Sequence, residues 1–131
     1  MIGNIVERFA QDPDIVRATV SDREGLLIAA VHGPAAQNSE LMADDELWNA
    51  CLAQLASNMN DHMMNLTLSQ PREVIINGSE DDVVIVQLSV GWLIAQVKPS
   101  ADWPHLRQKI GDIRDAFDSL TGDAVSTGTS S

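Results

Sequence analysis

The segment from Glu73 to Leu120 restricts the possible folds more than any other part of this 131-residue chain. It contains three short runs rich in Val, Ile and Leu, residues 73–78, 83–88 and 92–98, followed by an amphipathic run over 102–120. The connectors between the runs are too short for anything but antiparallel hairpins. Apolar residues occupy successive positions of the second and third runs, and successive side chains of a strand point to opposite faces of the sheet. We therefore expect a sheet that is covered on both faces.

The N-terminal part of the chain predicts a short helix and a hairpin. Residues 2–10 carry apolar side chains at helical spacing, and the element ends before Pro13, because the residue that precedes a proline avoids the helical region. Two β-type runs, 15–21 and 26–31, flank a turn in which Gly25 can adopt the positive φ of a tight hairpin. This hairpin supplies two more strands.

The middle and the end of the chain complete the pattern. Residues 32–43 contain turn-forming residues and show no hydrophobic periodicity, so they predict a surface loop. A long helix is expected over Asp44–Leu66, with acids in its first turn at the positive end of the helix dipole. In the last helix, Gly111 costs about 1 kcal/mol relative to alanine, so we expect it to pack closely against a strand. Residues 121–131 are small and polar and predict a disordered tail.

These elements predict a single α+β domain over residues 1–120. A chain of this length can bury a core without disulfides. The expected architecture is an αββαβββα three-layer sandwich built on a five-stranded antiparallel sheet. The long helix covers one face of the sheet, and the two terminal helices cover the other. This arrangement satisfies the apolar residues on both faces of the strands.

Charge and composition narrow the possible partners. Nineteen acids against eight bases give a formal net charge of −11, which repels the phosphate backbone of nucleic acids and favours a basic protein surface. The first residues lack a basic region followed by an apolar run, and no stretch approaches the roughly 18 apolar residues of a membrane span. We expect a soluble, cytoplasmic protein that does not insert into membranes.

No motif for catalysis or cofactor binding is present in the sequence. There is no P-loop pattern, and His32, His62 and His105 lie in separate predicted elements without metal-ligand spacing. The single cysteine, Cys51, lies in the long helix beside leucines and is predicted to be a buried, inert thiol. We expect no catalytic residue, no metal and no cofactor. An enzyme would require polar groups from separate loops to converge without a motif, in a deep pocket with perturbed pKa values.

The long helix carries two sets of candidate binding residues. Its apolar arc is wide, so one edge can pack on the sheet while the other meets a second helix, a copy of itself, through Leu52, Ala56, Met59 and Met63. The alternative is that the whole stripe is intramolecular core. At the start of the helix, an exposed indole of Trp48 beside acids would anchor a partner with a basic rim, through Asp44, Asp45, Glu46 and Trp48. The alternative is that Trp48 is part of the core.

Four features of the sequence belong together: the order αββαβββα, the opening D-R-E-G-L-L-I-A-A hairpin, the long helix and the E-V-I-I-N-G…V-V-I-V…G-W-L-I-A-Q-V meander. In these features the chain resembles the roadblock/dynein light-chain domain family over residues 2–120. The resemblance implies a non-enzymatic module that dimerises with a second copy or a paralogue. The third strands of the two copies pair into one continuous sheet, and the long helices lie side by side. On this sequence the pairing strand consists of Glu73, Val74, Ile75, Ile76 and Asn77, and the helix segment that lies beside its copy is 47–63.

Family members are scaffolds or regulators of small Ras-like GTPases, or adaptors on the dynein motor. The resemblance therefore implies a GTPase partner that is activated or tethered, without a catalytic arginine from this chain. An acidic dimeric chaperone for secreted effector proteins is the alternative. Such a chaperone would have three strands before its central helix and two after it, whereas this sequence predicts two and then three.

Overall fold

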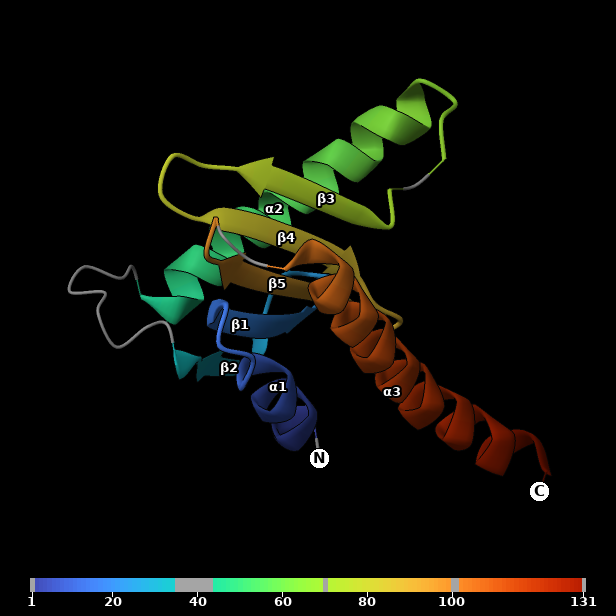
Figure 1. The fold of residues 1–131 in the computed structure, drawn as a ribbon. Helices are drawn as coiled ribbons and strands as arrows, with labels where there is room; N and C mark the ends of the chain where they lie inside the picture. Colours follow the sequence, from blue (N-terminus) through green and yellow to red (C-terminus); the bar gives the residue numbers. More distant parts are fainter. Residues whose placement is uncertain (1, 35–43, 70, 100–101, 131) are drawn as a thin grey trace.

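The computed structural model describes residues 2–34, 44–69, 71–99 and 102–130, with side chains described as far as residue 120. The chain folds in the predicted order αββαβββα (Figure 1). Of the predicted loop over 32–43, His32 ends the second strand, and residues 35–43 lie outside the described ranges. The elements are α1 (Ile2–Ala10), β1 (Ile15–Asp22), β2 (Leu27–His32), α2 (Asp45–Asn65), β3 (Glu73–Asn77), β4 (Asp82–Gln87), β5 (Gly91–Val97) and α3 (Trp103–Ser130).

The five strands form one antiparallel sheet in the order β2-β1-β5-β4-β3. The first hairpin and the β3–β4–β5 meander therefore meet at a single seam between β1 and β5. The β1–β2 turn follows the sequence prediction, because Gly25 has a φ of +90°, a conformation that glycine adopts without a steric penalty. β2 and β3 are the two edges of the sheet.

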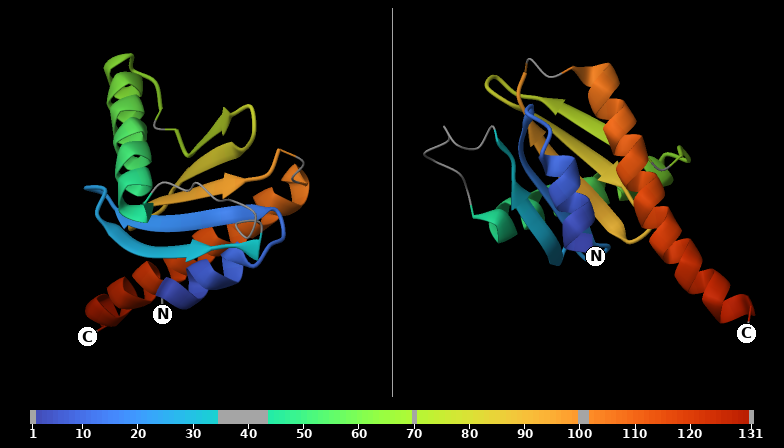
Figure 2. Two further views of the ribbon diagram at one scale, coloured as in Figure 1. Left: turned by 90° about the vertical axis from the view of Figure 1, so that its left-hand side faces the viewer. Right: turned by 60° about the horizontal axis from the view of Figure 1, so that its bottom comes forward.

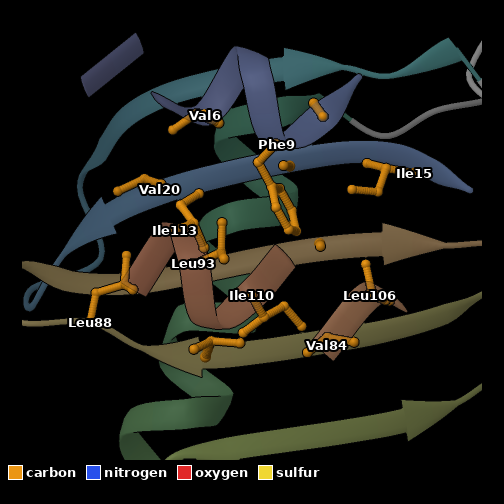
Figure 3. Packing of buried hydrophobic residues seen from close by; sticks show 14 of the residues in the cluster. Val6, Phe9, Ile15, Val20, Val84, Leu88, Leu93, Leu106, Ile110 and Ile113 are labelled. Atoms are coloured by element: carbon orange, nitrogen blue, oxygen red, sulfur yellow. The ribbon is translucent and has the colours of Figure 1, made fainter. Parts of the chain in front are cut away.

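The layers also agree with the prediction. Figure 2 shows α2 on one face of the sheet and both α1 and α3 on the other. The terminal helices bury the larger core, in which Phe9 of α1 and Ile110 and Ile113 of α3 point onto the strands (Figure 3). Within the described residues this cluster has sixteen buried members. It supplies most of the hydrophobic stabilisation of the fold.

The core beneath α2 is much smaller. Its buried members among the described residues are Ala53 and Ala56 from α2 and Ile85 and Ile94 from the sheet. The two alanines let the helix approach β1, β2 and β5 closely, and the C-terminal half of α2 projects beyond the sheet (Figure 2, left). The α2 face is therefore only partly covered near β3.

Two details of α3 differ from the sequence pattern. A Cβ at Gly111 would have no atom within 4 Å, so the predicted close packing against a strand is wrong. The apolar stripe of α3, which carries Ile110 and Ile113, packs on the sheet instead, and Gly111 lies beside that stripe. The helix also continues beyond Leu120, to Ser130. The disorder of residues 121–131 stays a prediction.

Candidate interaction surface

The outer edge of β3 presents backbone groups that no described strand pairs with. The backbone N–H of Gln87 donates to the carbonyl oxygen of Arg72 at 2.9 Å, which fixes the phase of the β3–β4 ladder. Because bonded and non-bonded pairs alternate in an antiparallel ladder, Val74 and Ile76 bond to β4. The residues whose N–H and C=O groups point away from β4 are therefore Glu73, Ile75 and Asn77. This edge is a template for another strand.

The predicted β3 residues divide between the two faces of the sheet. Val74 and Ile76 are half-buried and pack toward α2, while Ile75 is exposed on the opposite face. The carboxylate of Glu73 lies 4.0 Å from the guanidinium of Arg107 in α3. The strand thus contributes apolar contacts below α2 and backbone groups along its edge.

The flank of α2 that faces β3 carries half-buried apolar side chains. Leu52, Met59 and Met63 lie on it, beside the small cluster under the helix. Ala56 does not belong to this flank, because its side chain is only 2% exposed and packs against Ile85 and Ile94. Placing Ala56 in a contact with a second helix is therefore wrong for α2 in this position. The other three predicted helix residues remain accessible at its margin.

At the start of α2, two of the predicted partner-binding residues are held by an internal cation. Arg17 of β1 is 3% exposed, and its Nη1 atom lies 3.1 Å from Oδ1 of Asp45. Its guanidinium also lies over the indole ring of Trp48, 4.5 Å from the centroid. Nε2 of His32 lies 3.0 Å from the same Asp45 oxygen. Asp45 and half-buried Trp48 therefore fix the N-terminus of α2 on the sheet.

A buried polar network continues this anchoring. The hydroxyl of Thr19 donates to Oδ1 of Asn49 at 2.8 Å, and Nδ2 of Asn49 donates to the carbonyl oxygen of Gly25 at 3.1 Å. Nε of Arg17 donates to Oε1 of Gln96 at 3.1 Å. Such bonds are needed because buried polar groups without partners are costly. Sequence reasoning missed Arg17 and Asn49, although an arginine inside an apolar β-run was a visible signal.

The other two predicted partner-binding residues are exposed. Asp44 is the N-cap of α2, and its carboxylate accepts a hydrogen bond from the backbone N–H of Leu47 at 3.4 Å. Glu46 points to solvent. The exposed apolar residue beside them is Leu47, which is 60% exposed, and not Trp48. Sequence reasoning counted Leu47 in the helix segment beside a second copy and did not assign it to partner binding.

The prediction of a buried thiol is wrong, because Cys51 is exposed. At about 100° per residue, Cys51 lies about 160° from Ala53, which faces the sheet. Among the described residues, no group of three or more His, Cys, Asp or Glu side chains is placed to hold a metal ion. None of the helices in the described ranges is both long and apolar enough to cross a membrane.

A second ionic cluster joins the α1–β1 turn to the start of α3. Asp12 is 2% exposed, and its Oδ2 atom lies 3.1 Å from Nε2 of His105 and 3.3 Å from Nζ of Lys109. Burial raises the pKa of the Asp12 carboxyl, but the backbone N–H of Asp14 together with Lys109 and His105 outweighs burial and holds the pKa below its usual value. Asp12 is therefore an ionised structural anchor for α3.

Comparison with known proteins identifies the architecture. No protein-family model matches the chain, and no curated protein matches its sequence. Among solved structures, a roadblock/LC7 domain from Streptomyces avermitilis superposes with a TM-score of 0.74 at 15% identity, covering 91% of this chain and 96% of that one. The chain has the roadblock fold. Its strand count of two before α2 and three after it is the one expected of a roadblock domain and not of the chaperone alternative.

Two MglB structures share this roadblock fold. MglB of Myxococcus xanthus has a TM-score of 0.80 at 15% identity, covering 93% of this chain and 95% of that one. A structure described as MglB with tetrameric arrangement has a TM-score of 0.77 at 13% identity, covering 94% of this chain and 89% of that one. At these identities the likeness establishes the fold.

Proposed function

We propose that this roadblock domain is a non-catalytic, dimeric regulatory module of the cytoplasm that binds a small Ras-like GTPase and activates or tethers it. The observation that carries the proposal is the free edge of β3 beside a partly covered apolar flank of α2. The fold shared with MglB, one structure of which is described as tetrameric, supports an assembling regulatory role. The module contributes binding surface, and the GTPase contributes the chemistry.

In the proposed dimer, β3 pairs antiparallel with β3 of a second copy or a paralogue. The two-fold axis passes beside Ile75, the central residue of the strand, so that Glu73 faces Asn77 of the other copy. Ladder bonds then form between the backbone groups that point away from β4 in each copy. Leu52, Met59 and Met63 of the two α2 helices cover each other across the axis, which buries the apolar flank.

A disulfide cross-link tests this register. We would replace the exposed native thiol by Cys51→Ala and introduce Ile75→Cys. Directly opposed residues of a hydrogen-bonded antiparallel pair have Cα atoms about 5.5 Å apart, within the range of a disulfide. Mild oxidation should therefore convert the variant into a covalent dimer. Ile76→Cys is the matched control. In the proposed register the two residues 76 are offset along the strands, so their Cα atoms lie more than about 7 Å apart and the cysteines should not cross-link efficiently.

Solution mass tests the same contact without a cross-link. Light scattering over a dilution series should show a dimer for the wild-type chain. Ile75→Pro removes an N–H that points away from β4 and so leaves the β3–β4 ladder intact, whereas it interrupts pairing with a second copy. We expect this variant to be a folded monomer, and Ile75→Thr, which keeps the N–H, to remain a dimer. A wild-type monomer at every concentration would refute the proposed homodimer. A dimer formed with a purified paralogue would then support a heterodimer instead.

The GTPase partner is tested with purified small Ras-like GTPases from the same organism. Each GTPase is loaded with GDP or with a non-hydrolysable GTP analogue and titrated with the chain in a binding assay. Single-turnover GTP hydrolysis with and without the chain then separates activation from tethering. Binding that depends on the nucleotide supports the proposal. A failure of every GTPase to bind would refute it.

A further inference from the structure

The first hairpin and the N-terminal half of α2 form an exposed apolar surface that the proposed dimer does not use. Its large apolar residues are Leu26, Ile28 and Leu47, which are 64%, 44% and 60% exposed. We name this surface, with the adjoining side chains of Glu46 and Ala50, the hairpin flank. Contiguous exposed apolar surface on a domain of this size marks a binding site more often than scattered apolar residues do.

Two contacts bring the N-terminal half of α2 against the first hairpin, which carries Leu26 and Ile28. Asp45 at the start of α2 reaches His32 at the end of β2, and Asn49 one turn later reaches Gly25 in the turn of the hairpin. The N-terminal half of α2 therefore lies against β2 and the β1–β2 turn, and Figure 2 (left) shows the helix rising across these strands. Ala50 and Met59 lie about 180° apart around the helix, at about 100° per residue. The hairpin flank is thus on the opposite side of α2 from the apolar flank proposed to meet a second copy.

An irregularity in β2 turns Ile28 toward solvent. The register pairs Val20 with Ala29 and Ser21 with Leu27, so Ile28 is an extra residue opposite the β1 strand. Such a bulge redirects a side chain and interrupts the regular ladder. Ile28 is a member of neither core cluster and is 44% exposed, so part of its side chain is available to a partner.

The surface is hollowed between the hairpin and the helix. A recess of about 290 Å³ lies there, lined in part by Gly25, Ala50, Gln54 and Ser57. These side chains are small or flexible, and Gly25 has none. Arg23, Glu24 and Ala53 complete the lining, and a recess of this size accommodates one side chain from a partner. Leu26 follows Gly25 in the chain, and Leu47 lies about one helical turn before Ala50.

Exposed carboxylates outnumber exposed guanidinium groups beside the flank, with Glu24, Asp44 and Glu46 against Arg23. Asp45 is engaged by Arg17 and His32, but the carboxylates of Asp44 and Glu46 are exposed at the α2 end. At the hairpin end, Nη2 of Arg23 donates to the carbonyl oxygen of Ser89 at 3.4 Å. The chain as a whole carries a net charge of −11. An apolar surface with an acidic rim complements a partner with an apolar anchor ringed by Lys or Arg.

We infer that the hairpin flank is where the GTPase docks, through a contact face that presents an apolar side chain within a basic rim. This inference rests on the proposed function and assigns its partner a place. Charge complementarity favours this occupant over another copy of the acidic chain, which would bring negative charge against negative charge. The second copy and the GTPase bind on opposite sides of α2, so both are bound at once.

Two variants of the flank test the docking site. Leu47→Asp and Ile28→Asp each place a charge in the apolar centre of the flank. The matched control is Leu66→Asp, which makes the same change at a leucine 66% exposed at the far end of α2. In titrations of the purified, nucleotide-loaded GTPase, we expect Leu47→Asp and Ile28→Asp to weaken binding about tenfold or more, as expected for interface anchors. Leu66→Asp should bind like the wild type. Circular dichroism and solution mass should show that all three variants remain folded dimers.

A charge variant tests the acidic rim separately. Glu46→Gln should weaken binding at low salt by a few-fold and reduce its salt dependence, while Asp118→Asn on α3 should change neither. Wild-type affinity in both flank variants, with the GTPase still binding, would overturn the docking site and leave the proposed function standing. Loss of the dimer in the flank variants would also overturn it, because the flank would then be a contact between copies. Failure of the wild type to bind any GTPase would refute the proposed function together with this inference.

Discussion

Replacing Gly111 by alanine should stabilise the domain. The residue lies in the interior of α3, where glycine costs about 1 kcal/mol relative to alanine because its backbone loses more freedom on folding. A Cβ at this position would meet no atom within 4 Å, so no clash opposes the gain. We therefore expect Gly111→Ala to raise the free energy of unfolding by about 1 kcal/mol. For a domain of this size that corresponds to a rise in Tm of about 4 °C.

Urea denaturation followed by circular dichroism and tryptophan fluorescence measures this change. The midpoint should rise while the slope of the transition stays the same, and both proteins must be compared at one concentration because dimerisation adds to stability. Gly33→Ala is the opposing control. A Cβ there would lie 2.2 Å from the carbonyl oxygen of Ile15 and 2.7 Å from that of Ala10, both backbone atoms. We expect Gly33→Ala to destabilise the domain by roughly 1–3 kcal/mol. A loss of stability in Gly111→Ala would refute the reasoning, because it would show that a neighbour occupies the space beside α3.

Three further predictions concern ionic anchors and the thiol. The pKa of Asp12 is lower in the folded state than in the unfolded state. Its contribution to stability is therefore present above the unfolded pKa of about 3.9 and is lost as pH falls through the folded pKa. Asp12→Asn should lower stability at neutral pH and flatten the acid limb of a stability–pH curve below about pH 4. Asp45→Asn should lower the free energy of unfolding by about 1–2 kcal/mol in urea denaturation, because it removes the carboxylate that pairs with the buried guanidinium of Arg17. The loss stays this small because water partly screens the Asp45 carboxylate. The free energy of unfolding of Glu46→Gln should stay within about 0.5 kcal/mol of the wild type. Cys51 should react with a thiol reagent in the native protein nearly as fast as in urea, and slow labelling of the native state would contradict its exposed position.

The strands and their order were predictable because apolar runs and short connectors leave few alternatives. Val84 and Ile85 are adjacent in β4 and lie in the two separate cores on opposite faces of the sheet, as the unbroken apolar run predicts. Connector lengths dictated the hairpins, and the need to cover both faces dictated three layers. Periodicity and chain connectivity are local properties, so they can be read without knowing which strands become neighbours.

The buried face of α2 was harder to predict, for a physical reason. Its apolar arc is so wide that several rotations about the helix axis bury similar areas. The structure selects the rotation in which Asn49 bonds to Thr19, so a polar pair and small alanines decide the face instead of the large side chains. Cys51 and Leu47 then point to solvent. Such long-range polar pairs carry no sequence periodicity.

The seam between β1 and β5 also affects the order in which parts of the chain fold. Each side of the seam is built from neighbouring segments, since β1–β2 is a hairpin and β3–β4–β5 is a meander. Across the seam, Arg17 and Gln96 are register partners although they lie 79 positions apart in the sequence. Closing so long a loop costs entropy before any contact compensates for it, and this slows folding. We therefore expect the hairpin and the meander to form early and their docking along β1 and β5 to limit the folding rate.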